Sequence, residues 1–228
     1  MLVDPFYDTM ITQETRTAQD RWESTTMRKI RAIREDEMIA VFLYAELQSP
    51  RFCEKVEMYL QQFAVDRRLI QAPDLHDEQE NATRRALLGT YRDYGQGWGY
   101  FEGFPEQLRW ERIGLTRQEV EQVKYIEYDY WVELSGGSRL ARDGARRALA
   151  GIDVFGLSSK YFVDIAKALR QGAQFPTLIF VGRDEEGYLV VLEGHTRLTA
   201  YLIAPECLPA ELEVIVGFSE QITQWGCY

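Results

Sequence analysis

Hydrophobic residues in the first half of the chain repeat at the spacing of amphipathic helices. Apolar residues recur every three or four positions over 36–47, and a second run with this spacing follows the Ser-Pro pair at 49–50. Serine before proline is a common helix start. A third run covers 80–94 and ends in glycines. The pattern predicts a mainly helical subdomain over residues 1–123.

The pattern changes after residue 123, where strands and helices are expected to alternate. Polar and apolar residues alternate from 124 to 134, which predicts a strand. The elements expected after it are a helix over 139–150, a helix from Ser158 or Ser159 to Gly172, strands over 175–181 and 188–192 joined by a hairpin turn, a helix that ends before Pro205, and a strand over 212–216. We therefore expect an α+β fold, with a mixed sheet and its helices over residues 124–228.

Composition restricts the classes of partner. The chain carries a formal charge of −10, with 26 basic and 36 acidic residues, whereas phosphate-backbone binding needs a basic footprint. DNA is therefore not expected as a main partner. No apolar run approaches the roughly 18 residues of a membrane span, and the three cysteines form no CxxC pair. We expect a cytoplasmic protein with no membrane partner.

The turn Glu193-Gly194-His195-Thr196-Arg197 is the strongest candidate for chemistry. It joins an expected strand to an expected helix, where free amide N–H groups and the helix dipole attract an anion. Glycine allows close approach of the anion, and arginine adds a forked cation. The alternative is a plain turn in which the threonine caps the helix.

The surroundings of this turn resemble a known superfamily. Residues 155–220 follow the order of the ParB N-terminal domain, which is helix, strand, turn, strand, a G-x-x-R turn, helix and strand. In the ParB/sulfiredoxin superfamily the G-x-x-R turn holds the phosphates of CTP, ATP or ADP. The resemblance implies that Gly194, His195, Thr196 and Arg197 contact phosphate, and that Glu193 lies near a metal ion.

Two departures separate the chain from the best-known members. Sulfiredoxins carry their catalytic cysteine within this turn, where the present chain has His195. ParB proteins continue into a DNA-binding domain, which is not expected here. The GHTR form of the turn is more similar to that of the stand-alone free serine kinases.

A second glycine-rich turn, Ser135-Gly-Gly-Ser138-Arg139, has the composition of an anion-binding nest. Its Ser138 and Arg139 are further candidates for phosphate contact, and a plain helix cap is the alternative. Glu193, His195 and Asp143 are the candidate catalytic residues. Glu133 and Asp153 remain open as alternative bases.

The sequence thus predicts a nucleotide-binding protein that transfers phosphate from ATP or ADP to a small-molecule acceptor, or hydrolyses the nucleotide. CTP is a third candidate, and Mg²⁺ is expected with each. The main alternative is a ParB-like, CTP- or ATP-gated interaction module or DNA-associated module without small-molecule catalysis. A domain that kept the fold and lost the nucleotide is a third possibility.

Overall fold

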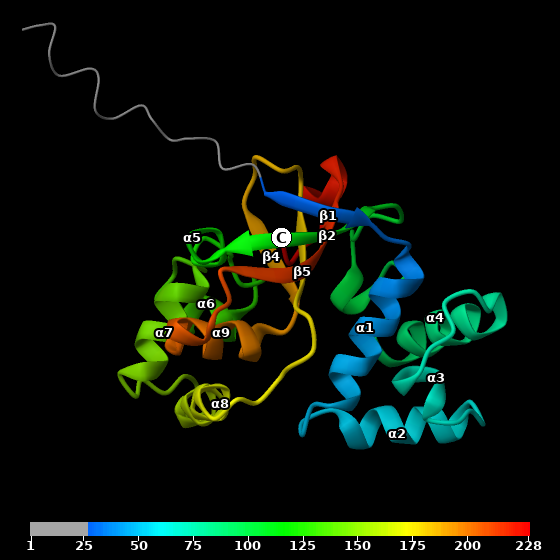
Figure 1. The fold of residues 1–228 in the computed structure, drawn as a ribbon, viewed down its shortest axis with the longest axis horizontal. Helices are drawn as coiled ribbons and strands as arrows, with labels where there is room; N and C mark the ends of the chain where they lie inside the picture. The colour runs from blue at the N-terminus through cyan, green and yellow to red at the C-terminus, as the bar shows by residue number, and fades with distance from the viewer. Residues whose placement is uncertain (1–26) are drawn as a thin grey trace, which may run out of the picture.

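A single mixed sheet organises the protein in a computed structural model that describes residues 27–228 (Figure 1). The strand order is β1-β2-β5-β3-β4. β3 runs parallel to β5, and the other neighbours are antiparallel. The strands are β1 (Arg28–Ala32), β2 (Arg109–Thr116), β3 (Ile179–Gly182), β4 (Leu189–Glu193) and β5 (Glu211–Phe218).

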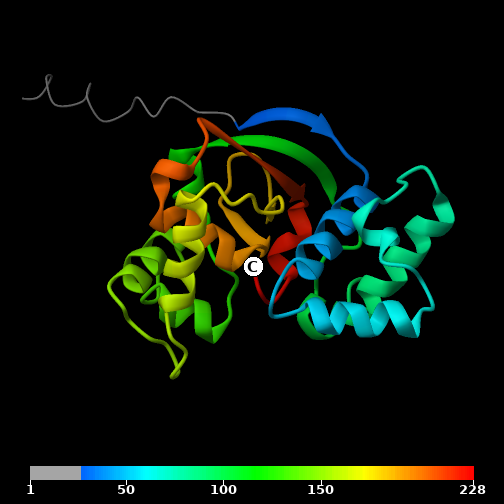
Figure 2. The same cartoon turned by 60° about the horizontal axis from the view of Figure 1, so that its bottom comes forward.

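Both faces of this sheet are covered, because successive residues of a strand point to opposite sides. Ile179 and Val181 of β3 pack toward the N-terminal helices, whereas Phe180 packs toward the C-terminal helices. Figure 2 shows the two groups of helices on either side of the strands. Strands β3 and β4 are accordingly apolar along nearly their whole length, and β5 is buried from Val214 onward.

Helices form in the N-terminal half where the spacing of apolar residues predicts them. They are α1 (Glu35–Leu47), α2 (Cys53–Gln62), α3 (Arg68–Gln71) and α4 (Glu78–Arg92). Asp77 caps α4 by accepting from the N–H groups of Gln79 and Glu80. The helical N-terminal region and the α+β class are as predicted.

The remaining helices are α5 (Arg117–Val120), α6 (Asp129–Leu134), α7 (Ala141–Leu149), α8 (Lys160–Arg170) and α9 (His195–Ile203). Short 3-10 turns lie at η1 (Gly99–Phe101), η2 (Pro205–Cys207) and η3 (Glu220–Gln224). α5 opens with a capping box between Thr116 and Glu119. Helices α7, α8 and α9 bury a core of their own beside the sheet.

The strand expected over 124–134 is wrong. Lys124 alone forms bridges, to Leu140 and Val190, and the chain then turns into α6. Two glycines with positive φ, Gly136 and Gly137, end the turn after this helix. More than half of this segment therefore forms the short helix α6 instead of joining the sheet.

Two strands on one side of the sheet were not anticipated. β1 and β2 come from the segment before residue 123, and β2 pairs with β5 along its whole length, from Arg109 opposite Phe218 to Thr116 opposite Glu211. The sheet thus includes chain from both sides of residue 123. None of the helices in the described part of the chain has the length and apolar character needed to cross a bilayer.

Candidate functional site

The predicted phosphate turn lies where β4 ends and α9 begins. Gly194 has φ of 103°, a conformation that L side chains rarely adopt. A Cβ added there would also overlap the side chain of Leu178. Glycine is therefore required at this junction on two independent grounds, and it brings the backbone of the turn close to its surroundings.

Three amide groups at this helix start lack a protein acceptor. The first hydrogen bond of α9 runs from the N–H of Leu198 to the carbonyl of Gly194, at 2.8 Å. Among residues 27–228, the N–H groups of His195, Thr196 and Arg197 have no acceptor. These groups carry the positive end of the helix dipole, so an anion would complete them.

The guanidinium of Arg197 is held in place by hydrogen bonds within the protein. Its Nη2 donates to Oε1 of Glu193 at 2.6 Å, and its Nη1 donates to the carbonyl oxygens of Pro176 and Thr177. The two charged side chains are largely buried, with 11% and 17% exposure. Arg197 therefore joins the turn to the segment before β3, and it holds the Glu193 carboxylate beside the free amides.

His195 is an uncharged residue in this setting. Its ring stacks against Trp131, with ring centroids 4.9 Å apart, and lies 6.3 Å from the ring of Tyr125. Burial, together with the positive charges of Arg92 and Arg197, lowers the pKa of His195 to about 3. Its Nε2 is buried without a partner among the described residues. A neutral imidazole with one unsatisfied nitrogen thus lies under the turn.

The N-terminal helices contribute a charged pair to the same place. Glu46 of α1 is 1% exposed and accepts hydrogen bonds from the Tyr91 hydroxyl, at 2.5 Å, and from Arg92. Burial, and next the nearby charge of Glu193, raise the pKa of Glu46. The Arg92 guanidinium also lies over the ring of Phe52, 4.3 Å from its centroid.

The candidate residues predicted from the sequence include neither Glu46 nor Arg92. A signal for Glu46 was present, because it follows Phe42 and Leu43 at the three- and four-residue spacing of the buried face of α1. A carboxylate on a core-facing position needs a partner. That partner is Arg92, whose Nε is itself buried and unpaired within the described residues.

The second predicted turn is satisfied by its own protein partners. The N–H groups of Gly136, Gly137 and Arg139 donate to Glu133 O, Val132 O and Ser135 Oγ. The Arg139 guanidinium donates to the carbonyls of Tyr125 and Cys227 and pairs with Glu127. Arg139 is thus linked to the first turn indirectly: it donates to the backbone carbonyl of Tyr125, whose ring lies 6.3 Å from that of His195.

The acidic residues predicted near this second turn hold local structure. Asp143 accepts from the Ser138 hydroxyl at 2.8 Å and from Arg146 at 3.0 Å. Asp153 accepts from the backbone and hydroxyl of Ser159, and Glu133 lies 3.6 Å from Arg147. Glu193 is the predicted acid that borders the free amides.

Metal ligands are sparse in the described part of the chain. Residues 27–228 contain no group of three or more His, Cys, Asp or Glu side chains placed to hold a metal ion. Mg²⁺ bound with a nucleotide, however, uses only one or two carboxylates, and phosphates and water supply its other ligands. Glu193 is compatible with that smaller role, since only one of its oxygens is engaged by Arg197.

Comparisons with known proteins add no relative. The chain matches no protein-family model, no curated protein and no solved structure. The function of the site therefore has to be argued from its own geometry.

Proposed function

We propose that the start of α9 binds the phosphates of a nucleotide, and that the protein transfers or hydrolyses one of them. The observation that carries this proposal is the set of three consecutive free N–H groups, on His195, Thr196 and Arg197, behind a glycine with positive φ. Such an arrangement binds anions through hydrogen bonds and the helix dipole.

The cations around these amides favour a polyanion over a single carboxylate. Arg92 approaches from α4, and Arg197 lies within the turn itself. Each arginine is paired with a glutamate, Glu46 or Glu193. The four charges balance, so the site carries no net charge from these side chains. An incoming phosphate then exchanges with a carboxylate as hydrogen-bond acceptor of an arginine.

His195 supports the same interpretation as an uncharged donor. With its pKa lowered to about 3, the imidazole is neutral at physiological pH. If its proton is on Nε2, this buried nitrogen has no protein acceptor among the described residues, and a phosphate oxygen would reach it once the neighbouring side chains make room. Its stacking on Trp131 fixes the ring plane, so the donor would be preorganised.

Phosphoryl transfer requires little covalent chemistry from the protein. It needs cations placed on the phosphates and an acid that orients the attacking group. Glu193, at the mouth of the turn, is the residue that would hold a bound Mg²⁺ together with the phosphates. That ion would neutralise charge as it develops on the transferred phosphate.

A non-catalytic nucleotide-gated module is the second candidate, and one observation favours it. Asp143, Asp153 and Glu133 are each engaged in local hydrogen bonds or ion pairs. Glu193 is thus left as the acid at the turn. The two candidates differ in turnover: an enzyme releases phosphate or phosphorylates an acceptor, whereas a module binds the nucleotide and leaves it intact.

Isothermal titration with ATP, ADP and CTP, each with Mg²⁺, tests binding. We expect at least one of these nucleotides to bind, and we expect Arg92→Gln and Arg197→Ala to weaken that binding. Arg85→Gln is the matched control, since Arg85 also lies on α4 and pairs instead with Glu35. No binding by the wild-type chain, or equal binding by all variants, would overturn the proposal.

A further inference from the structure

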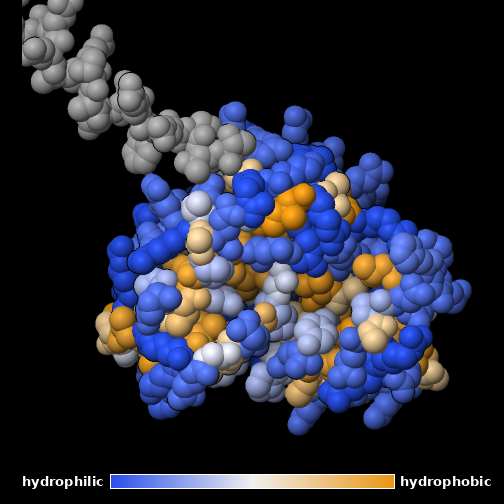
Figure 3. Space-filling model, in the orientation of Figure 1, coloured by the Kyte–Doolittle hydropathy of each residue, from blue (hydrophilic) through white to orange (hydrophobic). Residues whose placement is uncertain are grey.

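The start of α2 carries two basic side chains that have no carboxylate partner. Arg51 precedes the helix by two positions, and Lys55 lies in its first turn. Both are exposed, and neither forms an ion pair with another residue in the range 27–228; the acid between them, Glu54, pairs with neither. Hydrophilic side chains project from the lower edge of the space-filling view, where α2 lies (Figure 3). In a chain of formal charge −10, these two cations are available to an anionic ligand.

Two aromatic rings hold these cations beside Arg92. The Arg51 guanidinium lies over the ring of Phe52, 4.9 Å from its centroid, and the Arg92 guanidinium lies over the same ring at 4.3 Å. The Lys55 ammonium lies 5.2 Å from the centroid of the Tyr91 ring, over which Arg92 also lies, at 4.9 Å. The ring faces attract the cations, whereas the three positive charges repel one another. An anion bound among them would relieve this repulsion.

The cations at the start of α2 give the phosphate turn a surplus of positive charge. Arg92 is paired with Glu46, and Arg197 is paired with Glu193, so these four charges cancel. Arg51 has no such partner among the described residues, and its charge is not cancelled. The surplus favours a ligand with a further negative group beyond the phosphates held by the amides of α9.

Arg51 also faces the aromatic residues of α6. Burial, and next the charge of Asp153, raise the pKa of Tyr130, and the positive charge of Arg51 acts against this rise. The ring of Tyr130 meets that of Trp131 edge to face, with centroids 5.0 Å apart, and Trp131 stacks on His195. In Figure 2 the connection from α1 to α2 points toward the start of α9. Arg51 therefore lies between the two groups of helices, on the side of the phosphate turn.

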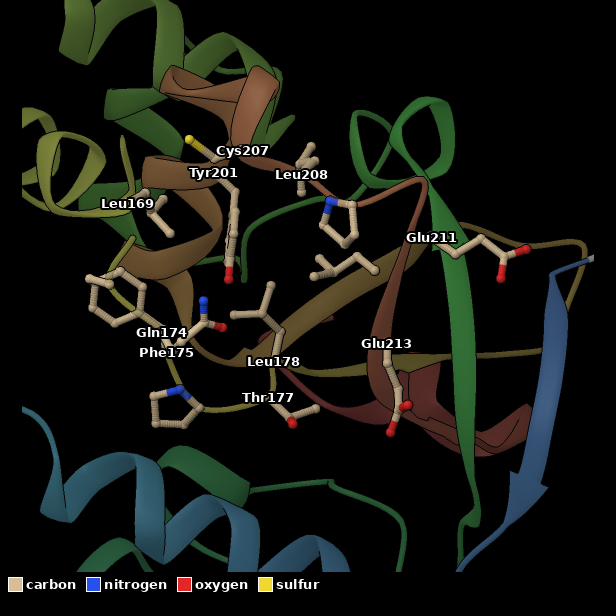
Figure 4. Close-up of a pocket in the computed structure, with 14 residues that line it drawn as sticks. Leu169, Gln174, Phe175, Thr177, Leu178, Tyr201, Cys207, Leu208, Glu211 and Glu213 are labelled. Atoms are coloured by element: carbon tan, nitrogen blue, oxygen red, sulfur yellow. The ribbon is translucent and has the colours of Figure 1, made fainter. Parts of the chain in front are cut away.

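A cavity on another side of the turn offers no such cation. It measures about 480 Å³ and borders the turn, because its walls include Pro176 and Thr177, whose carbonyls accept from Arg197 (Figure 4). The two acids that line it, Glu211 and Glu213, are each paired with an arginine, and no arginine or lysine is itself part of its lining. A chain of phosphates that leaves the start of α9 is therefore expected to run toward α2.

We propose that Arg51 and Lys55 bind the terminal phosphate of a nucleoside triphosphate whose other phosphates lie at the start of α9. This inference rests on the proposed function of that turn. A guanidinium binds phosphate through two parallel hydrogen bonds, and an ammonium binds it as a point charge. Among the described residues an aromatic ring, and no carboxylate, holds each of the two cations. Both can thus turn toward the ligand without breaking an ion pair, and they make the site selective for ATP or CTP over the diphosphates.

Isothermal titration with ATP and ADP, and with CTP and CDP, each with Mg²⁺, tests this selectivity. Arg51→Gln should weaken binding of the triphosphate about tenfold, as expected for the loss of a charge-assisted contact, and should weaken binding of the diphosphate less than about twofold. Arg67→Gln is the matched control, since Arg67 is an exposed arginine just after α2 that pairs with Glu57 at 2.7 Å. Equal binding of the triphosphate by wild type and Arg51→Gln, or equal weakening for both ligands, would overturn the inference and leave the phosphate site standing.

Polyphosphates without a nucleoside separate the inference from the identity of the base. Inorganic tripolyphosphate should bind the wild-type chain more tightly than pyrophosphate, and Arg51→Gln should remove most of this difference. Arg51→Lys should keep part of it, because lysine retains the charge and loses the fork. An unchanged preference for tripolyphosphate in Arg51→Gln would overturn the role of Arg51. A wild-type chain that binds none of these nucleotides and polyphosphates would overturn the phosphate site itself, and the inference with it.

Discussion

Arg197 donates to Glu193 at 2.6 Å, so the cation of the phosphate turn is already bound to the carboxylate beside it. A ligand phosphate has to compete with this carboxylate for the guanidinium. The same carboxylate is the group that would hold a metal ion with the phosphates. Glu193 is therefore expected to oppose the binding of metal-free nucleotide and to favour the metal complex.

Glu193→Gln separates these two effects. Removing the charge frees Arg197 and lessens repulsion, so metal-free ADP should bind roughly two- to fivefold more tightly. The gain in affinity on adding Mg²⁺ should shrink, and any phosphate release should fall. Titrations with and without Mg²⁺ measure both changes. Glu133→Gln is the control, since Glu133 lies on α6 beside Arg147, and weaker binding of metal-free ADP by Glu193→Gln would contradict this account.

Gly194→Ala tests whether the junction requires glycine. The substitution combines a positive φ with overlap against Leu178, so we expect a loss of about 1–3 kcal/mol of unfolding free energy. Gly172→Ala has a positive φ with open space around it and should cost about 1 kcal/mol. Urea denaturation of both variants measures the difference, and equal losses would show that the Leu178 contact has no effect.

His195 should make stability depend on pH. Its pKa is about 3 in the folded protein against 6.5 ordinarily. Between these two pH values the imidazole is protonated in the unfolded chain and neutral in the folded protein. The contribution of His195 to the free energy of unfolding is then fully present above about pH 6.5, and it falls toward pH 3 by up to about 1.4 kcal/mol per pH unit. The raised pKa of Glu46 acts in the opposite direction, so the test needs a comparison of variants.

The comparison is between the wild-type chain and His195→Phe, which keeps a ring against Trp131. Denaturation midpoints between pH 7 and pH 4 should fall less steeply in the variant. An NMR titration that gives His195 a pKa near 6.5 would rule out the neutral, buried imidazole.

The pair of Glu46 and Arg92 is expected to matter for both stability and binding. Glu46→Gln removes the charge that faces a largely buried guanidinium, which should lower the free energy of unfolding by about 1–3 kcal/mol. Binding of metal-free nucleotide should strengthen, because Arg92 no longer shares its charge with this carboxylate. Glu54→Gln on the exposed side of α2 is the control. Thermal unfolding and titration of both variants measure the effect, and a Glu46→Gln variant as stable as wild type would exclude a structural role for the pair.

Local sequence patterns predicted the elements that are determined by residues close together in the chain. The spacing of apolar residues located α1, α2 and α4. The turn at Gly194 could be placed because a strand must end and a helix must begin around it. These features depend on contacts between residues close together in the chain.

The remaining features depend on contacts between distant residues. The segment 124–134 can form a strand only if a neighbouring strand is free to pair with it. Within this segment only Lys124 forms such bridges, to Leu140 and Val190. β2 became a strand by pairing with β5, about a hundred residues later. Likewise, Glu46 and Arg92 reach Glu193 through the packing of α1 and α4 on the sheet, which no local spacing specifies.

Backbone NMR of the three free amides is the most direct test of the phosphate site. On titration with ATP and Mg²⁺, the N–H resonances of His195, Thr196 and Arg197 should shift first and furthest, and inorganic pyrophosphate should shift the same resonances. The assignment of the start of α9 as a nucleotide phosphate site would be contradicted if other resonances shifted while these three did not, or if no resonance shifted at any ligand concentration.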